Sequence, residues 1–410
     1  MKFSRQHILF IFLLLFFLLV RYSCNYRIQL WEDHDIALNI LNEGEFYYDS
    51  DGARNHTFQF PVYPHLLAAG YYISGEIPAF AIALNIFFHV LTAFLLYRIF
   101  HVLSELLFKQ FTGHQVRNIS LLASGLFLFH PALVMYAFFH VHPISLNVFT
   151  LFLALYFSIR FMLDPGRQNS LALGVVTGLC MLDRATAIFV WVPAFLWIVN
   201  SGGFKKYFRE FFRITIITFL VVLPWLIHNF YTDGIIGFES SAAKNKWKGV
   251  LYNSEGGNYL KNGENYYTAL NAQEKVALGE LTPIEQRDFF QGKYAEIVHN
   301  DPGHAIKMFF VKLKNFWWFR NSAGEEWESL RSWLVVYKVI FALVLCGILL
   351  FLYLTRIQGL IILSFPLAVS FLQAYFYVET RHRIAFEPLL IFFAAISFYY
   401  VISNNRKTLK

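Results

Sequence analysis

Charged residues are scarce in this chain. Asp, Glu, Lys and Arg make up 15% of its 410 residues, whereas hydrophobic residues make up 57% and Phe alone occurs 47 times. With a mean hydropathy of +0.46, this composition excludes an ordinary soluble globule, because long apolar runs belong in a bilayer. The sequence therefore predicts a polytopic membrane protein.

Cysteine is also scarce. Cys24, Cys180 and Cys346 cannot all pair, and the last two fall within apolar stretches, so the sequence indicates neither a disulfide framework nor a thiol metal site. The chain also lacks a G-x-S-x-G motif, a Walker loop and a dinucleotide fingerprint. The sequence therefore contains no motif for a nucleophilic triad or for nucleotide-driven transport.

Ten apolar stretches are long enough, or nearly so, for the roughly 17 to 25 residues that a bilayer core requires. They predict an all-α polytopic membrane protein with about ten transmembrane helices, at residues 8–24, 78–100, 119–137, 144–163, 169–183, 185–200, 212–231, 332–354, 357–378 and 384–403. The first is predicted to be an uncleaved anchor, because Arg21-Tyr22-Ser23-Cys24 is not a small-residue cleavage site.

Basic residues predict the orientation of these helices. With a cytoplasmic amino terminus, the inner segments contain fifteen Lys and Arg residues and only three acidic residues. Since basic loops stay in the cytoplasm, both termini are predicted to be cytoplasmic in a cell (inner or plasma) membrane. The pI of 9.1 reflects this topology and does not indicate a nucleic-acid partner.

The predicted topology leaves five polar segments on the outer, non-cytoplasmic face: residues 25–77, 138–143, 183–184, 232–331 and 379–383. The longest exceeds a simple connector and predicts a small extracytoplasmic helical domain at 232–331. It lies between an amino-terminal transmembrane module, 1–231, and carboxy-terminal transmembrane helices, 332–410. Helix starts are predicted within it at Thr282-Pro283-Ile284-Glu285 and at Asp301-Pro302, and an irregular loop at 249–263.

The first outer segment begins with an acidic cluster, Glu32, Asp33 and Asp35. Carboxylates this close together raise one another's proton affinity, which suits a general base or a divalent-cation site as well as a plain solvated loop. A short interfacial helix is predicted at about 36–42, where Ile36, Ile40 and Leu41 have helical spacing, and on one helical turn the three acids cannot all face one way. Further on, Pro61 and Pro64 are predicted to exclude a regular helix.

Basic and imidazole side chains are predicted on the same face. Arg184, Arg381 and Arg383 are placed to grip a phosphate through paired hydrogen bonds, with lipid headgroups or neighbouring acids as alternative partners. His140 and His142 have the spacing of a metal pair, but no HExxH motif or Cys accompanies them. Hydrogen bonding to a sugar or phosphate is therefore the preferred role for the histidines at the outer ends, among them His34, His65, His140, His142 and His382.

Five fragments, taken in order, resemble the GT-C superfamily of integral-membrane glycosyltransferases. The resemblance covers nearly the whole chain and is to the branch with protein mannosyltransferases, the aminoarabinose transferases of lipid A and the RgtA/B/C/D-like bacterial enzymes. The fragments are Ala37-x-Asn39-Ile40-Leu41-x-x-Gly44, Phe60-Pro61-Val62-Tyr63-Pro64, Gly178-Leu179-x-x-Leu182-x-Arg184, Pro224-Trp225-x-Ile227-x-Asn229 and Arg381-His382-Arg383-x-x-x-x-Pro388.

The resemblance implies a GT-C-like fold and the transfer of a sugar from a polyprenyl-phosphate donor, on the non-cytoplasmic face, to a glycan, lipid or protein acceptor. It assigns the base to the first outer loop, where Asp33 and Asp35 remain alternatives with Glu32 as neighbour. The expected donor-phosphate ligands are Arg184, Arg381 and Arg383, and Tyr63 joins the five histidines above as an expected substrate ligand. No cofactor is certain, and a divalent cation, Mg²⁺ or Mn²⁺, remains an alternative.

Two other functions compete with this interpretation. A transporter or flippase of a lipid-linked or anionic solute fits the many spans, but its ionisable residues belong near the bilayer midplane. A non-catalytic assembly protein would use the Trp- and Tyr-rich outer segment to bind a partner. Substitution of Asp33 and Asp35 separates these functions, because only the enzyme loses turnover while it keeps its fold.

Overall fold

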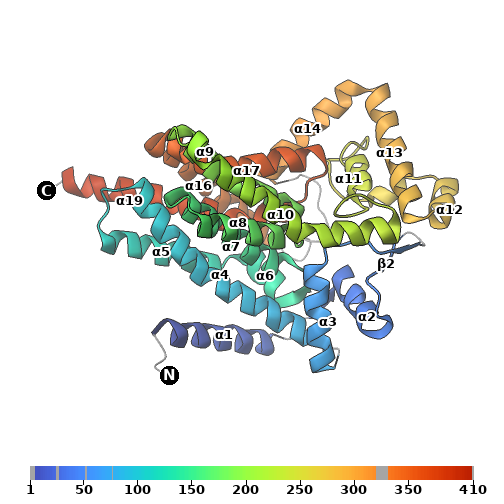
Figure 1. Cartoon of the computed structure of the whole chain (residues 1–410), viewed down its shortest axis with the longest axis horizontal. Coiled ribbons are helices and arrows are strands. Elements are labelled where there is room, and N and C mark those ends of the chain that lie inside the picture. The colour runs from blue at the N-terminus through green and yellow to red at the C-terminus, as the bar shows by residue number, and fades with distance from the viewer. Residues whose placement is uncertain (1–4, 25–26, 51–52, 76, 320–330, 409–410) are drawn as a thin grey trace.

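The computed structural model describes residues 5–24, 27–50, 53–75, 77–319 and 331–408. Most of these residues are helical, and the longer helices lie together as a bundle (Figure 1). The bundle helices are α1 (Arg5–Ser23), α4 (Pro78–Leu107), α5 (Gly113–Leu128), α6 (Pro131–Phe139), α7 (Ile144–Leu163), α8 (Arg167–Met181), η1 (Ala185–Trp191), α9 (Val192–Asn200), α10 (Phe204–Asp233), α16 (Arg331–Thr355), α17 (Ile357–Tyr375), α18 (Thr380–Ile384) and α19 (Glu387–Thr408).

Helices occupy all ten of the predicted apolar stretches, and the polytopic all-α architecture is confirmed. Among the described residues, five helices are long and apolar enough to cross a membrane, and a sixth span is formed if α5 and α6 are joined. Those two helices meet at an angle of 49°, because Pro131 has no backbone N–H to continue the hydrogen bonding of α5. Three further apolar helices are shorter, within α1, η1–α9 and α19, so the count of long spans is below ten.

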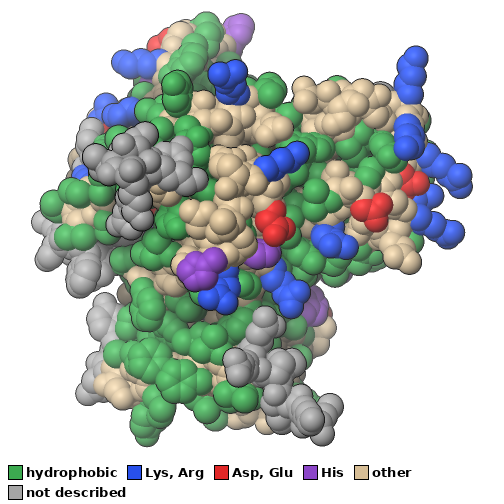
Figure 2. Space-filling view, turned by 90° about the vertical axis from the view of Figure 1, so that its left-hand side faces the viewer, with side chains coloured by type: hydrophobic (Ala, Val, Ile, Leu, Met, Phe, Trp, Pro, Cys, Tyr) green, Lys and Arg blue, Asp and Glu red, His purple; other side chains and the backbone are tan. Residues whose placement is uncertain are grey.

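The chain segments sort to the two ends of this bundle. Figure 1 shows α2 (Glu32–Glu43) and α11 (Ala242–Lys248) at one end, whereas α1 begins and α19 ends toward the other. Seen from that second end, the surface displays many Lys and Arg side chains and few acidic ones (Figure 2). Basic residues therefore gather at the end of the bundle that is opposite to α2 and α11.

A second, smaller core lies in the segment that follows α10. Its helices are η2 (Tyr266–Ala269), α12 (Ala272–Glu280), α13 (Pro283–Asn300) and α14 (Pro302–Trp317), together with α11. Trp247 of α11, Leu278 of α12 and Phe290 of α13 are almost completely buried and belong to one hydrophobic cluster. This segment thus has an apolar core of its own, although residues 320–330 of the predicted 232–331 domain lie outside the described residues.

Both predicted helix starts in this segment are confirmed. The Glu285 carboxylate accepts from the Thr282 backbone N–H at 2.9 Å and from the Thr282 hydroxyl at 2.6 Å, so α13 begins with a capping box. Asp301 caps α14 by accepting from the backbone N–H of His304 at 2.9 Å. The stretch at 249–263 is irregular, as its Gly and Asn content predicted, with isolated bridges at Ser254–Leu260 and Tyr259–Asn265.

The prediction at the two prolines is wrong. A regular helix, α3 (Val62–Ser74), begins directly after Pro61, and Pro64 is its third residue. The first four N–H groups of a helix have no partner within it, so a proline in the first turn removes no hydrogen bond. A helix is present at the predicted 36–42, as α2, which begins four residues earlier, at Glu32.

Short strands hold the acidic helix against the bundle. The strand β1 (Gln29–Leu30) pairs in parallel with β4 (His140–Val141), which brings the start of α2 beside the turn between α6 and α7. A hairpin of β2 (Tyr48–Ser50) and β3 (Ala53–Asn55) follows α2. After the hairpin, His56 and Thr57 bind the Asp233 carboxylate at 2.8 and 2.9 Å, which ties the first outer segment to the end of α10.

Candidate functional site

A cavity of about 980 Å³ lies at the end of the bundle that carries α2 and α11. All five of the polar segments that the sequence placed on one face contribute to its walls, including residues more than 300 positions apart. Its acidic, basic and imidazole lining residues are Glu32, Asp33, His142, Asp183, Arg184, Glu239, Lys244, Lys246, Lys248, Arg287, Asp288, Arg381 and His382. The five polar segments that the sequence assigned to one face therefore meet at one cavity.

The acidic cluster contributes two of its three carboxylates to this cavity. Glu32 and Asp33 line the cavity, and Asp33 is only 2% exposed, whereas Asp35 is exposed and does not line it. The difference follows from the helix, because residues two apart in α2 point in nearly opposite directions. The structure therefore selects Asp33 over Asp35 as the acid that faces the cavity.

The surroundings of Asp33 favour its protonated form. Burial raises the pKa of this carboxyl well above its usual value, and the carboxylates of Glu32 and then Asp183 raise it further. A backbone hydrogen bond opposes the shift only in part. A carboxylate whose pKa has been moved toward neutrality is a better proton acceptor at physiological pH than an exposed aspartate.

Asp183 has a different environment from that of Asp33. Its carboxylate accepts from the Thr150 hydroxyl at 2.9 Å. With its NH₂ group toward Asp183, the side-chain amide of Asn147 donates to both carboxylate oxygens, at 2.6 and 2.8 Å. Burial also raises the pKa of Asp183, to about 7, while the Thr150 hydroxyl and the charge of Arg184 oppose the shift. Asp183 differs from Asp33 in having two side-chain donors, which fix its position in the wall of the cavity.

Two of the three predicted arginines line the cavity. The Arg381 guanidinium lies over the Trp31 ring, 5.2 Å from its centre, and Arg184 enters from the residue before η1. Burial lowers the pKa of His142 well below its usual value, and the charges of Arg381 and Arg184 lower it further. His142 is therefore a neutral ring close to two guanidinium groups.

Arg383, the third predicted phosphate ligand, does not line the cavity. Its side chain is fully buried, and its Nε donates to Glu387 at 2.7 Å while Nη1 donates to the Phe316 carbonyl at 3.2 Å. The guanidinium also lies 3.9 Å from the centre of the Phe341 ring. Arg381 and Arg383 are two residues apart on α18, so when one faces the cavity the other faces the core.

The predicted substrate ligands divide in the same way. His142, His382 and Tyr63 line the cavity, and the Tyr63 hydroxyl donates to Asn85 at 3.0 Å. The other three, His34, His65 and His140, do not line the cavity and form hydrogen bonds within the protein. Their partners are the Tyr71 hydroxyl at 2.9 Å, the Pro61 carbonyl at 2.6 Å and the Met135 carbonyl at 3.2 Å, respectively.

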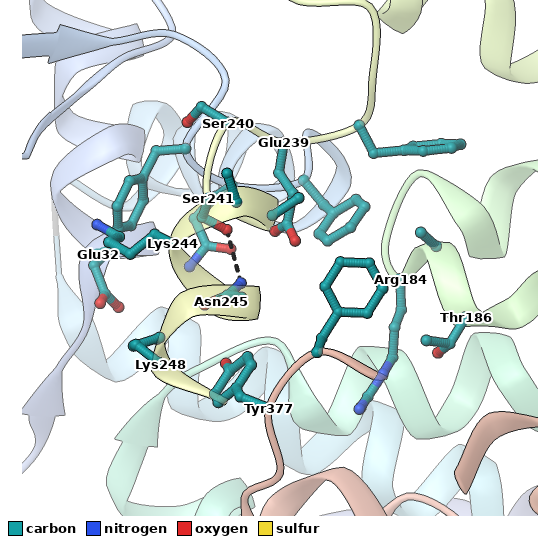
Figure 3. A pocket seen from close by; sticks show the side chains of 18 of the residues that line it. Glu32, Arg184, Thr186, Glu239, Ser240, Ser241, Lys244, Asn245, Lys248 and Tyr377 are labelled. Atoms are coloured by element: carbon teal, nitrogen blue, oxygen red, sulfur yellow. Dashed lines mark hydrogen bonds between the residues drawn. The ribbon is translucent and has the colours of Figure 1, made fainter. Parts of the chain in front are cut away.

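The sequence interpretation missed one wall of the cavity. In α11, Lys244, Lys246 and Lys248 all line it, next to Glu239 (Figure 3). The sequence did offer a signal, because three lysines within five residues are unusual in a segment predicted to lie on the face opposite to the basic loops. Figure 3 shows Lys244 and Lys248 on one side of the cavity and Arg184 on the other, with Glu239 and Tyr377 between them.

The segment that contains α11 and α14 contacts the bundle along the loop between α17 and α18, just before Arg381. Lys312 of α14 is 1% exposed, and its Nζ donates to the Phe376 carbonyl at 2.9 Å. The Val378 N–H donates to the Gly256 carbonyl at 2.8 Å. A Cβ on Gly249, the residue after α11, would lie 1.7 Å from the Phe376 carbonyl oxygen, so only glycine permits this approach.

Gly249→Ala is therefore expected to loosen the contact between the segment that carries α11 and the helix bundle. It should destabilise the protein by about 1–3 kcal/mol, the usual cost of overpacking. Limited proteolysis of the protein in lipid nanodiscs measures the loosening of the outer segment. The matched control is Gly292→Ala in α13, where an added Cβ meets nothing within 4 Å and the helix should gain stability. Equal protease resistance of both variants would contradict the role given to Gly249.

The described residues contain no cluster that would hold a metal ion through protein side chains alone. No group of three His, Cys, Asp or Glu side chains is placed to do so in that part of the chain. Of the predicted acidic trio, Glu32 and Asp33 line the cavity, whereas Asp35 is exposed and does not. No step of the chemistry below is therefore routed through a metal.

The comparisons with known proteins give a similarity to solved structures alone. No family model and no curated protein matches the chain. The chain is similar to the crystal structures of ArnT from Cupriavidus metallidurans in the apo state and bound to undecaprenyl phosphate, with TM-scores of 0.42 and 0.40 and 13% identity to each. The similarity covers 93% of this chain and 76% and 77% of the two ArnT chains. It assigns no role to any residue here.

Proposed function

We propose that this protein is an integral-membrane glycosyltransferase that moves a sugar from a polyprenyl-phosphate donor to an acceptor hydroxyl. Asp33 is the general base, and Arg184 and Arg381 bind the donor phosphate. The observation that carries the proposal is the arrangement of a buried carboxyl and two guanidinium groups around one cavity at the ends of apolar helices.

The chemistry follows from what each group supplies. The Asp33 carboxylate takes the proton of the acceptor hydroxyl, and the oxygen attacks the anomeric carbon of the donor. The bond between that carbon and the phosphate oxygen breaks, and the lipid phosphate leaves with the electron pair. Arg184 and Arg381 stabilise the negative charge that develops on the phosphate. One base and one displacement predict inversion at the anomeric carbon.

The neutral groups on the cavity wall suit recognition of the sugar. His142 is held uncharged by burial and by the neighbouring guanidiniums, and its Nδ1 accepts from the Ile144 backbone N–H at 3.2 Å. Nε2 then carries the proton and is available to donate to a sugar hydroxyl. His382 and Tyr63, which line the same cavity, are the other candidates for contacts with the sugar.

The proposed location is a cell membrane with the cavity on the non-cytoplasmic side. Basic side chains gather at the opposite end of the bundle, where α1 begins and α19 ends, and basic segments stay in the cytoplasm (Figures 1 and 2). In this orientation the polyprenyl chain of the donor lies among the apolar helices and delivers its phosphate to the cavity. The acceptor, a glycan, lipid or protein, enters from the outside.

A panel of polyprenyl-phosphate sugars tests this proposal. Purified protein in lipid nanodiscs is incubated with each donor, with and without a chelator, and the release of lipid phosphate is measured. At least one donor is expected to release lipid phosphate, and release should persist in chelator because no metal-binding group of residues is found among the described residues. Movement of an intact solute across the bilayer, with no release from any donor, would instead favour a transporter.

A further inference from the structure

A short turn after α10 forms one wall of the cavity. Residues 234–241, which we call the cavity turn, join the end of α10 to α11, and residues 235–241 all line the cavity. In the view of Figure 3, Glu239 and Ser241 of this turn lie between Glu32 and Arg184. The cavity turn thus borders the space between the helix that carries the proposed base and the proposed phosphate site.

Two side chains of α10 hold the cavity turn by its backbone. Asn229 is 0% exposed, and its Nδ2 donates to the Gly237 carbonyl at 2.7 Å and to the Phe238 carbonyl at 3.2 Å. The Trp225 Nε1 donates to the same Phe238 carbonyl at 3.1 Å. The Asn229 backbone carbonyl also accepts from the Ile235 N–H at 3.2 Å. The shape of the turn therefore depends on residues one and two helical turns before the end of α10.

The ring of Trp225 connects the cavity turn to the acidic helix α2. It packs against Phe46 in a T-shaped arrangement with the ring centres 5.1 Å apart, and both belong to a small buried cluster with Ile36. Ile36 is three residues after Asp33 on α2, so the two side chains lie on one side of the helix. Trp225 therefore contacts the turn through its N–H and the base-bearing segment through its ring.

The far end of the cavity turn is attached to the first outer segment. The Ser240 N–H donates to the Thr57 carbonyl at 2.9 Å, and the Asn55 side chain donates to the Ser240 hydroxyl at 2.8 Å. Asn55 is the last residue of the hairpin that follows α2. With one end held by α10 and the other by this hairpin, the turn has a defined position relative to α2.

We propose that Trp225 and Asn229 are positioning residues, which hold the cavity turn at the spacing from Asp33 that glycosyl transfer requires. This inference rests on the proposed function. Neither residue lines the cavity, so both act through the turn. Since a misplacement of about 1 Å can lower a rate about 10²-fold, loss of their hydrogen bonds should slow transfer. Donor binding should persist, because Arg184 and Arg381 come from other elements.

The first measurement is hydrogen–deuterium exchange of the full chain in lipid nanodiscs. In Asn229→Ala, the amides of Ile235 and Ser240 should exchange about tenfold faster, because two carbonyls of the turn lose a donor. Trp225→Phe keeps the ring and removes only the N–H, so its effect should be smaller. The matched control is Ile227→Ala, at a 46% exposed position of the same helix, which should exchange as the wild type does.

The second measurement is lipid phosphate release from a donor that the wild type uses. Asn229→Ala is expected to lower kcat about 10–100-fold, while KM for the donor changes by less than about threefold. The number of polyprenyl-phosphate sites, titrated by calorimetry, should stay that of the wild type. Trp225→Phe should show the same split to a smaller extent, and serves where Asn229→Ala does not fold. Ile227→Ala should keep the wild-type kcat.

The double variant tests the carbonyl that the two side chains share. Trp225→Phe/Asn229→Ala should lower kcat by more than the product of the two single losses, because only then does the Phe238 carbonyl lose both of its donors from α10. A purely multiplicative loss would show that the two residues do not act through this carbonyl.

Three outcomes would overturn the proposal. Unchanged exchange in Asn229→Ala would show that the side chain does not hold the turn. Faster exchange with a wild-type kcat, or an equal loss of kcat and of polyprenyl-phosphate sites, would show that the residues only stabilise the fold. If no donor releases lipid phosphate from the wild type, the proposed function fails and the positioning role with it, whereas faster exchange would still show that Asn229 holds the turn. Exchange needs no turnover, so the two failures are distinguished.

Discussion

Asp33→Asn is expected to lower the rate of sugar transfer by about 10²–10⁴-fold, the usual contribution of a general base. Asparagine has nearly the same volume and keeps the buried position, so the fold and donor binding should persist. Transfer is measured as lipid phosphate release, and donor affinity by calorimetry in nanodiscs. A loss of donor affinity equal to the loss of rate would show that Asp33 binds the donor and does not act as the base.

Asp35→Asn is the matched control for this result. Asp35 belongs to the same helix turn but is exposed and outside the cavity, so its substitution should change the rate by less than about threefold, as surface substitutions usually do. The resemblance to GT-C enzymes left Asp33 and Asp35 as alternatives. If Asp35→Asn abolishes transfer and Asp33→Asn does not, the choice made from burial is wrong.

The pH dependence of transfer gives a second readout of the same carboxyl. A base must be ionised, so the rate should rise with pH as Asp33 loses its proton, at a pKa well above the usual value of aspartate because the group is buried. Glu32→Gln removes the second cause of this shift and should move the acidic limb of the profile to lower pH. A merely structural role for Glu32 would leave the position of the limb unchanged.

The bundle was predictable from hydropathy because apolar length and basic loops are constraints that the bilayer imposes on each segment separately. Helix starts were predictable for a similar reason. Thr282 with Glu285, and Asp301 with Pro302, satisfy their helix ends within a few residues of sequence. The gathering of distant segments at one cavity also followed, since all of them had been assigned to one face.

The direction of individual side chains was not predictable in the same way. Arg381 and Arg383 were treated alike because both lie in the short segment 379–383 between two predicted spans, and the five-residue helix α18, which separates them by half a turn, was not predicted there. Glu387, the partner that withdraws Arg383 into the core, lies one turn further on. The sequence shows a charged residue near a membrane boundary, whereas pairing in the core depends on a partner that only the fold identifies.

The lysines of α11 were missed for a related reason. They lie in a segment of low hydropathy that was expected to form helices of its own, and its docking on the loop after α17 depends on long-range contacts. Lys312 reaches the Phe376 carbonyl from 64 residues away, and Gly249 fits against the same carbonyl. Only this docking turns a lysine-rich surface helix into a wall of the cavity.

Arg383→Gln is expected to lower the free energy of unfolding by about 3–5 kcal/mol, the cost of removing one partner from a buried ion pair. Arg383 is 0% and Glu387 1% exposed. Without Arg383, the Glu387 carboxylate would stay in the core with the hydrogen bonds to His130 and Tyr337 but without its cationic partner. The stacking of the guanidinium on Phe341 is lost as well. Thermal and denaturant unfolding in detergent measure the change.

Arg381→Gln is the matched control, because it removes an arginine two residues away that faces the cavity. It should leave the free energy of unfolding within about 1 kcal/mol, since its side chain is not part of the buried pair, and should instead weaken donor binding. The double variant Arg383→Gln/Glu387→Gln should be more stable than the sum of the two single losses predicts, because it leaves no unpaired charge in the core. If Arg383→Gln has the same free energy of unfolding as the wild type but no longer binds donor phosphate, Arg383 reaches the substrate and its assignment to the core is wrong.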